Sequence, residues 1–146
     1  MREESTILLV EDDPNDVILI KRAFEKAKIA NPITVVRDGE EAIEYLDRCG
    51  PDEAKAPIPI LILLDLRLPR KSGFEVLEHM RGMENAVCRV PVVVLTSSKH
   101  TSDINRAYEL GANSYLVKPI SFDGLVDMVD TLKLYWLIIN QPPEVV

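Results

Sequence analysis

Five short segments of the chain are apolar at nearly every position, and this pattern constrains the fold more than any other feature. They are Thr6–Val10, Ile33–Val36, Ile60–Leu64, Val90–Leu95 and Ser114–Val117. A strand with one face in water alternates apolar and polar residues, whereas a strand covered on both faces is continuously apolar. The pattern therefore predicts strands of a parallel sheet that carries helices on both faces.

Helix-start signals lie between these segments. The expected N-cap residues are Asp13, Asp38, Ser72, Thr101 or Ser102, and Ser121. Pro14 suits a first helical turn, and Asp38 and Ser72 are each followed three residues later by a glutamate, as in a capping box. The fourth helix is expected to end at Gly111, and the fifth to run from about residue 122 to 139.

Five strand–helix units with right-handed crossovers give one α/β fold class. We predict a doubly wound, five-stranded parallel sheet of the flavodoxin-like type, with strand order 2-1-3-4-5 and five helices. The 146 residues are expected to form a single domain, 1–146, with an extended C-terminal helix and a short tail.

Composition excludes several classes of partner. Acidic residues outnumber basic ones by 24 to 17, and no basic stripe stands out, so direct binding to nucleic acid is not expected. No apolar run is long enough for a membrane span, and the N-terminus lacks a signal-peptide pattern. Cys49 and Cys88 have no metal-ligand spacing. We expect a cytoplasmic protein that does not bind membranes.

Polar residues follow the predicted strands at their carboxyl ends, where ligands bind in folds of this type. They are Glu11, Asp12 and Asp13 after the first strand, Asp65 after the third, Thr96 after the fourth and Lys118 after the fifth. Clustered carboxylates require a compensating charge, and Mg²⁺ prefers oxygen ligands. A carboxylate can also attack phosphorus to form an aspartyl phosphate. The set suits phosphoryl transfer, in which Lys118 and Thr96 would bind phosphoryl oxygens.

Four stretches, "ILLVEDDP", "LILLDLRLPRKSGFEVL", "VPVVVLTSS" and "GANSYLVKPI", together resemble the receiver domain of two-component response regulators. The resemblance covers roughly Thr6 to Leu132. It implies a phosphoacceptor in a His-Asp phosphorelay: a histidine kinase transfers a phosphoryl group to Asp65, and a protein-interaction surface then switches. Such a protein is a signalling phosphoacceptor rather than an enzyme, although it takes part in its own Mg²⁺-dependent phosphorylation and dephosphorylation.

The resemblance also implies a metal site. The implied ligands of Mg²⁺ or Mn²⁺ are Asp12, Asp65 and the main-chain carbonyl of Arg67. Glu11 would not bind the ion directly but would lie next to these ligands and add negative charge. Glu11 replaces the aspartate that is commoner in the family. Asp13 is an additional acid, and it is either a helix cap or a residue that adjusts metal affinity.

The remaining family positions concern the phosphoryl group and the switch. Thr96 and Lys118 would bind the phosphoryl group, and Tyr115 matches the aromatic residue that turns inward when the threonine moves. Pro119 follows Lys118 in a peptide that receivers usually hold cis. Ser98, like Arg67, occupies a position that in the family affects how long the phosphoryl group survives.

The C-terminal segment "TLKLYWLII", Thr131–Ile139, is apolar on more than one helical face. A helix of this kind usually has a second surface to bury. We predict homodimerisation through the fifth helix and this extension of it, with a contribution from the fourth helix or the fifth strand. The expected interface residues are Leu132, Tyr135, Trp136 and Ile139. The alternative is that the segment folds back onto its own domain. We expect a stand-alone receiver whose output is a protein contact or a phosphorelay.

A narrower resemblance rests on "EDDPNDVILI", "VRDGEEAIEYL", the long loop that follows, and "YWL". These stretches are similar to small response regulators of bacterial phytochromes, so the implied partner is a sensor histidine kinase of the bacteriophytochrome type. Two alternatives stay open from the residues. One is a degenerate receiver that binds partners without phosphorylation. The other is a small flavin- or nucleotide-binding protein of the same fold.

Overall fold

A computed structural model describes the chain except residues 1–4, 51, 53–54, 140 and 142–146. Five parallel strands form one sheet in the order β2-β1-β3-β4-β5, as predicted. The strands are β1 (Ile7–Val10), β2 (Ile33–Val36), β3 (Leu61–Leu64), β4 (Val92–Thr96) and β5 (Ser114–Val117). The helices are α1 (Pro14–Lys26), α2 (Gly39–Arg48), α3 (Gly73–Arg81), α4 (Thr101–Glu109) and α5 (Phe122–Leu132). A 3₁₀ helix, η1 (Ala86–Arg89), and a π-helix, η2 (Lys133–Ile139), complete the elements.

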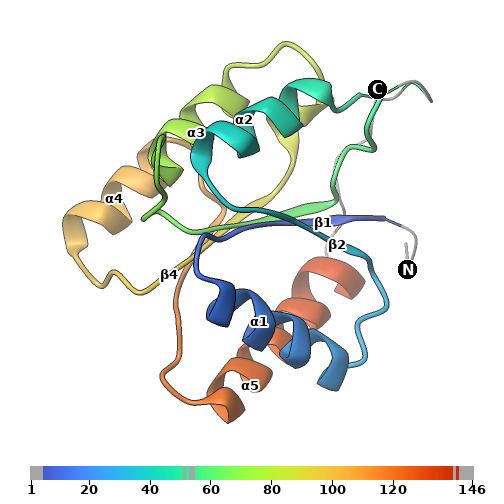
Figure 1. Ribbon diagram of the computed structural model, residues 1–146, viewed down its shortest axis with the longest axis vertical. Helices are drawn as coiled ribbons and strands as arrows, with labels where there is room; N and C mark the ends of the chain where they lie inside the picture. Colours follow the sequence, from blue (N-terminus) through green and yellow to red (C-terminus); the bar gives the residue numbers. More distant parts are fainter. Residues whose placement is uncertain (1–4, 51, 53–54, 140, 142–146) are drawn as a thin grey trace.

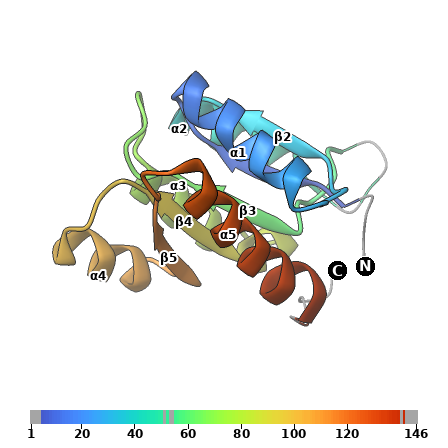
Figure 2. The ribbon, with the colours of Figure 1, turned by 90° about the horizontal axis from the view of Figure 1, so that it is seen from below.

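The sheet is covered on both faces, which explains why its central strands are continuously apolar. Helices α1 and α5 pack on one face and α2, α3 and α4 on the other (Figures 1 and 2). In β1, Leu8 and Val10 belong to the core under α2 and α3, whereas Ile7 and Leu9 belong to the core under α1 and α5. Within the part of the chain that the structure describes, no helix combines the length and apolar character needed to cross a membrane.

Most helices begin where the sequence predicts. Asp13, Asp38, Ser72 and Ser121 each accept a hydrogen bond from a main-chain N–H of the helix they precede. Among these, a complete capping box is present only at Ser72. Glu41, the glutamate three residues after Asp38, accepts a hydrogen bond from the main-chain N–H of Arg37 instead of that of Asp38. The prediction for α4 was wrong: its N-cap is His100, which makes no side-chain capping bond.

The C-terminal helix reaches Ile139, but its last part differs from the single α-helix that was expected. After Leu132 the chain continues as the π-helix η2. Nζ of Lys133 donates a hydrogen bond of 2.9 Å to the carbonyl oxygen of Ala27, at the end of α1. The wider π turn changes the direction of the following side chains, and Trp136 and Leu137 pack against the α1–α5 core.

Gly73 makes a testable contribution to this architecture, because α3 begins against the main chain that carries Asp65. A Cβ atom at Gly73 would lie 2.3 Å from the carbonyl oxygen of Asp65, whereas one at Gly82 would meet nothing closer than 3.6 Å. We expect Gly73→Ala to lower the free energy of unfolding by about 2 kcal/mol through overpacking. Gly82→Ala, the matched control, should change it by less than about 1 kcal/mol. Urea unfolding of both variants would measure this, and equal effects would contradict it.

Candidate functional site

The carboxyl edge of the sheet brings together the acids that the sequence placed there. Glu11 and Asp12 follow β1, and Asp65 follows β3. Glu11 and Asp65 are almost fully buried, whereas Asp12 is exposed. One carboxylate oxygen from each of the three lies within 4.8 Å of the others. A group of hard oxygen donors with one side open to water is what a divalent cation such as Mg²⁺ or Mn²⁺ prefers.

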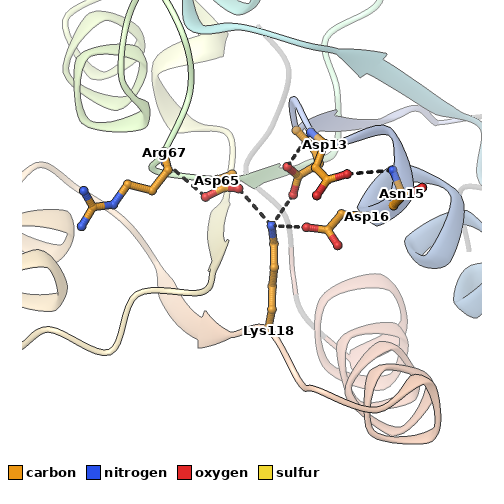
Figure 3. A network of polar contacts seen from close by, with 7 residues as sticks. Asp13, Asn15, Asp16, Asp65, Arg67 and Lys118 are labelled. Atoms are coloured by element: carbon orange, nitrogen blue, oxygen red, sulfur yellow. Dashed lines mark hydrogen bonds and ion pairs between the residues drawn. The ribbon is translucent and has the colours of Figure 1, made fainter.

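Lys118 reaches this cluster from the end of β5. Its Nζ lies 3.0 Å from Oδ2 of Asp65 and 2.9 Å from Oδ2 of Asp16, and it also pairs with the carboxylate of Glu11 (Figure 3). Asp16 was not predicted as a site residue. It lies in the first turn of α1 instead of directly after a strand, so only the position of that helix at the sheet edge could have indicated it.

Burial and charge act together on this cluster. Burial raises the pKa of Glu11 to about 7, although Lys118 opposes the rise, and the negative charge of Asp65 adds to it. Burial alone would lower the pKa of Lys118, but its hydrogen bonds to Asp16 and Glu11 and the charge of Asp65 raise that pKa overall. The ammonium group therefore stays charged, and one cation faces several acids. The surplus of negative charge favours a bound metal ion.

Thr96 ends β4 with its side chain fully buried. Its Oγ1 finds no hydrogen-bond partner among the described residues. Leaving such a group unpaired costs roughly 1–3 kcal/mol. A buried hydroxyl that is kept unpaired beside a charged cluster is available to a ligand.

The remaining predicted positions lie around this edge. The main-chain N–H of Arg67 donates to Oδ1 of Asp65 at 3.2 Å. The hydroxyl of Tyr115 donates to the carbonyl oxygen of Ser98 at 3.0 Å. Asp13 accepts a hydrogen bond of 2.8 Å from the N–H of Asn15, so of its two predicted roles the structure supports the helix cap.

The peptide bond before Pro119 is trans, so the prediction of a cis bond was wrong. The trans form is intrinsically favoured before proline. Here it already allows Nζ of Lys118 to contact the carboxylates, while the main-chain N–H of Lys118 donates to the carbonyl oxygen of Thr96 at 2.8 Å.

The predicted dimer-interface residues are divided between the core and the surface. Leu132 is buried in the α1–α5 core, where it continues the inward-facing stripe of α5, and its place in an interface stays a prediction. Trp136 is half-buried against the same core. Tyr135 is 52% exposed, as is its neighbour Leu134 at 54%. The side chain of Ile139 lies outside the described part of the structure.

Comparison with known proteins identifies the arrangement. The family model described as "Response regulator receiver domain" matches residues 7–130. The chain is 44% identical over 137 residues to the "Probable methanogenesis regulatory protein FilR2" of Methanothrix harundinacea, which covers 94% of this chain and 86% of the relative. It is 40% identical over 131 residues to the response regulator Rcp1 of Synechocystis, covering 90% of this chain and 88% of the relative.

Solved structures of two such relatives superimpose closely. The phosphorylated cyanobacterial phytochrome response regulator RcpA matches with a TM-score of 0.87 and 38% identity, over 97% of this chain and 99% of RcpA. The Mn²⁺-bound form of Rcp1 matches with a TM-score of 0.83 and 38% identity, over 96% and 99% of the two chains. The second of these relatives binds a divalent ion, and the acidic cluster here fits such an ion.

We expect Asp12→Asn to abolish measurable binding of Mn²⁺, because it removes a carboxylate from the cluster of three. Asp13→Asn is the matched control: its amide oxygen can still cap α1, so binding should persist. Isothermal titration calorimetry would measure both affinities. Mn²⁺ at about 100 times its Kd should also stabilise the wild type by about 2.7 kcal/mol, but not Asp12→Asn. Equal affinities for the two variants would place the ion elsewhere.

Proposed function

The chain belongs to the response regulator receiver domain family and is a phosphoacceptor of two-component signalling, and we propose that Asp65 is its acceptor residue. The observation that carries this assignment is the position of the Asp65 carboxylate. It is almost fully buried, bound by Lys118 at 3.0 Å and grouped with two further carboxylates. We propose that the chain acts as a signalling protein rather than an enzyme and takes part only in its own phosphorylation and dephosphorylation.

On this proposal, a carboxylate oxygen of Asp65 attacks the phosphorus atom of a phosphohistidine on the kinase. The P–N bond breaks, its electron pair returns to the imidazole nitrogen, and an acyl phosphate forms on Asp65. Asp12, Asp65 and the main-chain carbonyl of Arg67 would hold Mg²⁺, and Glu11 would add a further negative charge close to these ligands. The ion would supply positive charge that offsets the charge of the phosphoryl oxygens. Lys118, which stays charged, pairs with another of these oxygens.

Thr96 and Tyr115 would pass the change to the surface. The hydroxyl of Thr96 is buried and unpaired, so a phosphoryl oxygen on Asp65 would supply the hydrogen-bond partner that it lacks among the described residues. Movement of Thr96 toward that oxygen would leave space for the ring of Tyr115. The hydroxyl of Tyr115 donates to the carbonyl oxygen of Ser98, which lies in the loop between β4 and α4. Phosphorylation would thereby favour the second of two states.

We further propose that the phosphodonor is a sensor histidine kinase of the bacteriophytochrome type and that transfer takes place in the cytoplasm. RcpA, a phytochrome response regulator, shares 38% of its sequence with this chain over nearly the full length of both. Both cysteines are free, as in a reducing compartment. Cell fractionation would test the location.

The acceptor residue can be tested by intact-mass spectrometry after incubation with Mg²⁺ and acetyl phosphate. We expect the wild type to gain one phosphoryl group and Asp65→Asn to gain none, because the amide is a poor nucleophile. Asp127→Asn, at an exposed position of α5, is the matched control and should be modified like the wild type. An unmodified wild type would favour a degenerate receiver. Modification by acetyl phosphate but not by a phosphorylated bacteriophytochrome kinase would reject only the proposed donor.

We also propose that the chain forms a homodimer through β5 and the end of α5. β5 is the last strand of the described sheet, so one of its edges is unpaired there. A mainly apolar groove of about 390 Å³ lies between that strand and the helix. Its lining residues are Ser114, Leu116, Met128, Thr131, Leu132, Tyr135 and Trp136. A second copy of this chain would cover the groove together with the exposed apolar side chain of Leu134.

Size-exclusion chromatography with light scattering would test the dimer. We expect twice the chain mass of 16.4 kDa for the wild type and a single chain mass for Tyr135→Glu, because a carboxylate cannot be buried there without a partner. Ile18→Glu on α1 replaces a side chain of similar exposure, 48% against 52%, and should leave the dimer intact. A wild type that stays monomeric at every concentration would reject the interface.

A further inference from the structure

Asp103, in the first turn of α4, binds two hydrogen-bond donors that flank the proposed phosphoryl site. Nη2 of Arg67 lies 3.1 Å from Oδ2 of Asp103, and the hydroxyl of Ser98 donates to the same oxygen at 2.6 Å. Arg67 lies two residues after Asp65, and Ser98 lies two residues after Thr96. The carboxylate of Asp103 therefore contacts both the loop after β3 and the loop after β4, which border the site.

The main chain and the side chain of Arg67 contact different parts of the molecule. Its main-chain N–H donates to Asp65, while its side chain extends away from Lys118 toward the α4 side (Figure 3). The Arg67 side chain is 69% exposed and so is not fixed by packing, and its pairing with Asp103 determines where the guanidinium lies. The hydrogen bond from Ser98, with the charge of Arg67, holds the pKa of Asp103 below its usual value, so this carboxylate is ionised.

We propose that Asp103 is a positioning residue that competes with the phosphoryl group for Arg67 and Ser98. In the unphosphorylated chain it keeps the guanidinium and the hydroxyl at α4. The inference rests on the proposed role of Asp65: an acyl phosphate there offers several acceptor oxygens and more negative charge than one carboxylate, and guanidinium groups bind such groups in a bidentate manner. Phosphorylation would draw Arg67 away from Asp103 and release the first turn of α4.

The attachment of α4 explains why this release would move the helix. Of its nine residues, all of them described, only Ala107 is buried. Its N-cap makes no side-chain capping bond. Beyond its C-terminal end the chain is fixed by Arg81, whose Nε and Nη2 donate to the carbonyl oxygen of Gly111 at 3.0 and 2.8 Å. The contacts of Asp103 attach the N-terminal end of α4, where the main-chain N–H of His100 also donates to the hydroxyl oxygen of Ser98 at 3.3 Å. On the proposal, their loss would let this end move relative to the end held by Arg81.

A purely structural role for Asp103 has different consequences. An acid in the first turn stabilises any helix through the helix dipole. Its removal would then lower stability without changing how the site accepts a phosphoryl group. Asp123, an exposed acid in the first turn of α5, is a matched control for that effect.

The test is the rate of phosphorylation by acetyl phosphate with Mg²⁺, followed by intact-mass spectrometry. We expect Asp103→Asn to accelerate modification about threefold, a size typical of a partly exposed ion pair. In an Arg67→Gln background the same change should have a clearly smaller effect, because only the competition for Ser98 remains, and a double-mutant cycle isolates the coupling to Arg67. High salt should reduce the difference between wild type and Asp103→Asn. The half-saturating concentration of beryllofluoride, a stable phosphoryl mimic, should fall by the same factor. Asp123→Asn should resemble the wild type in both assays.

The outcomes separate this inference from the function on which it rests. A wild type that takes no phosphoryl group overturns both. If the wild type is modified but Asp103→Asn is no faster, or is equally faster with and without Arg67, the competition is rejected while Asp65 remains the acceptor. A lower melting temperature with unchanged rates and affinities would likewise reject the competition and leave Asp103 a structural residue.

Discussion

The ammonium group of Lys118 is the interaction on which the site depends. It extends from β5 to the acids that follow β1 and β3 and to Asp16 of α1, so it joins segments that are far apart in the sequence. Glu11 and Asp65 can be buried together because this cation partly offsets their charges. The offset is incomplete, since more carboxylates than cations meet there. This surplus of negative charge favours the binding of a divalent ion.

The fold could be predicted from the sequence because burial on both faces leaves a direct mark on a strand. β1 and β3 are buried at every position, and their continuous apolar segments indicated this. Helix caps were predictable where a side chain supplies the bond, as at Ser72, and not at His100, where the helix begins without one. The turn from α5 to the π-helix η2 depends on tertiary contacts such as that between Lys133 and Ala27, which no local pattern encodes.

The candidate site was predictable to the same extent, and for the same reason. A parallel sheet gathers the residues that directly follow its strands, so Asp12, Asp65 and Lys118 could be placed together from their positions alone. Asp16 was missed because it acts from within a helix. The burial of Leu132 in its own core was missed because a helix that is apolar on several faces does not reveal which face meets that core. Only packing distinguishes that face from the exposed one at Tyr135.

The unpaired hydroxyl of Thr96 and the paired side chain of Arg67 suggest how one phosphoryl group would act on two elements. The hydroxyl of Thr96 lacks a partner among the described residues, so a phosphoryl oxygen would add a hydrogen bond at the end of β4. Arg67 already pairs with Asp103, so binding of Arg67 to the phosphoryl group would remove that ion pair from α4. Ser98 belongs to both arrangements, because its hydroxyl binds Asp103 and its carbonyl accepts the bond from Tyr115 of β5. On these proposals, the new hydrogen bond of Thr96 and the loss of the contact between Arg67 and Asp103 both occur in the phosphorylated state. The two individually weak changes are therefore coupled, and together they would alter the surface formed by α4 and β5.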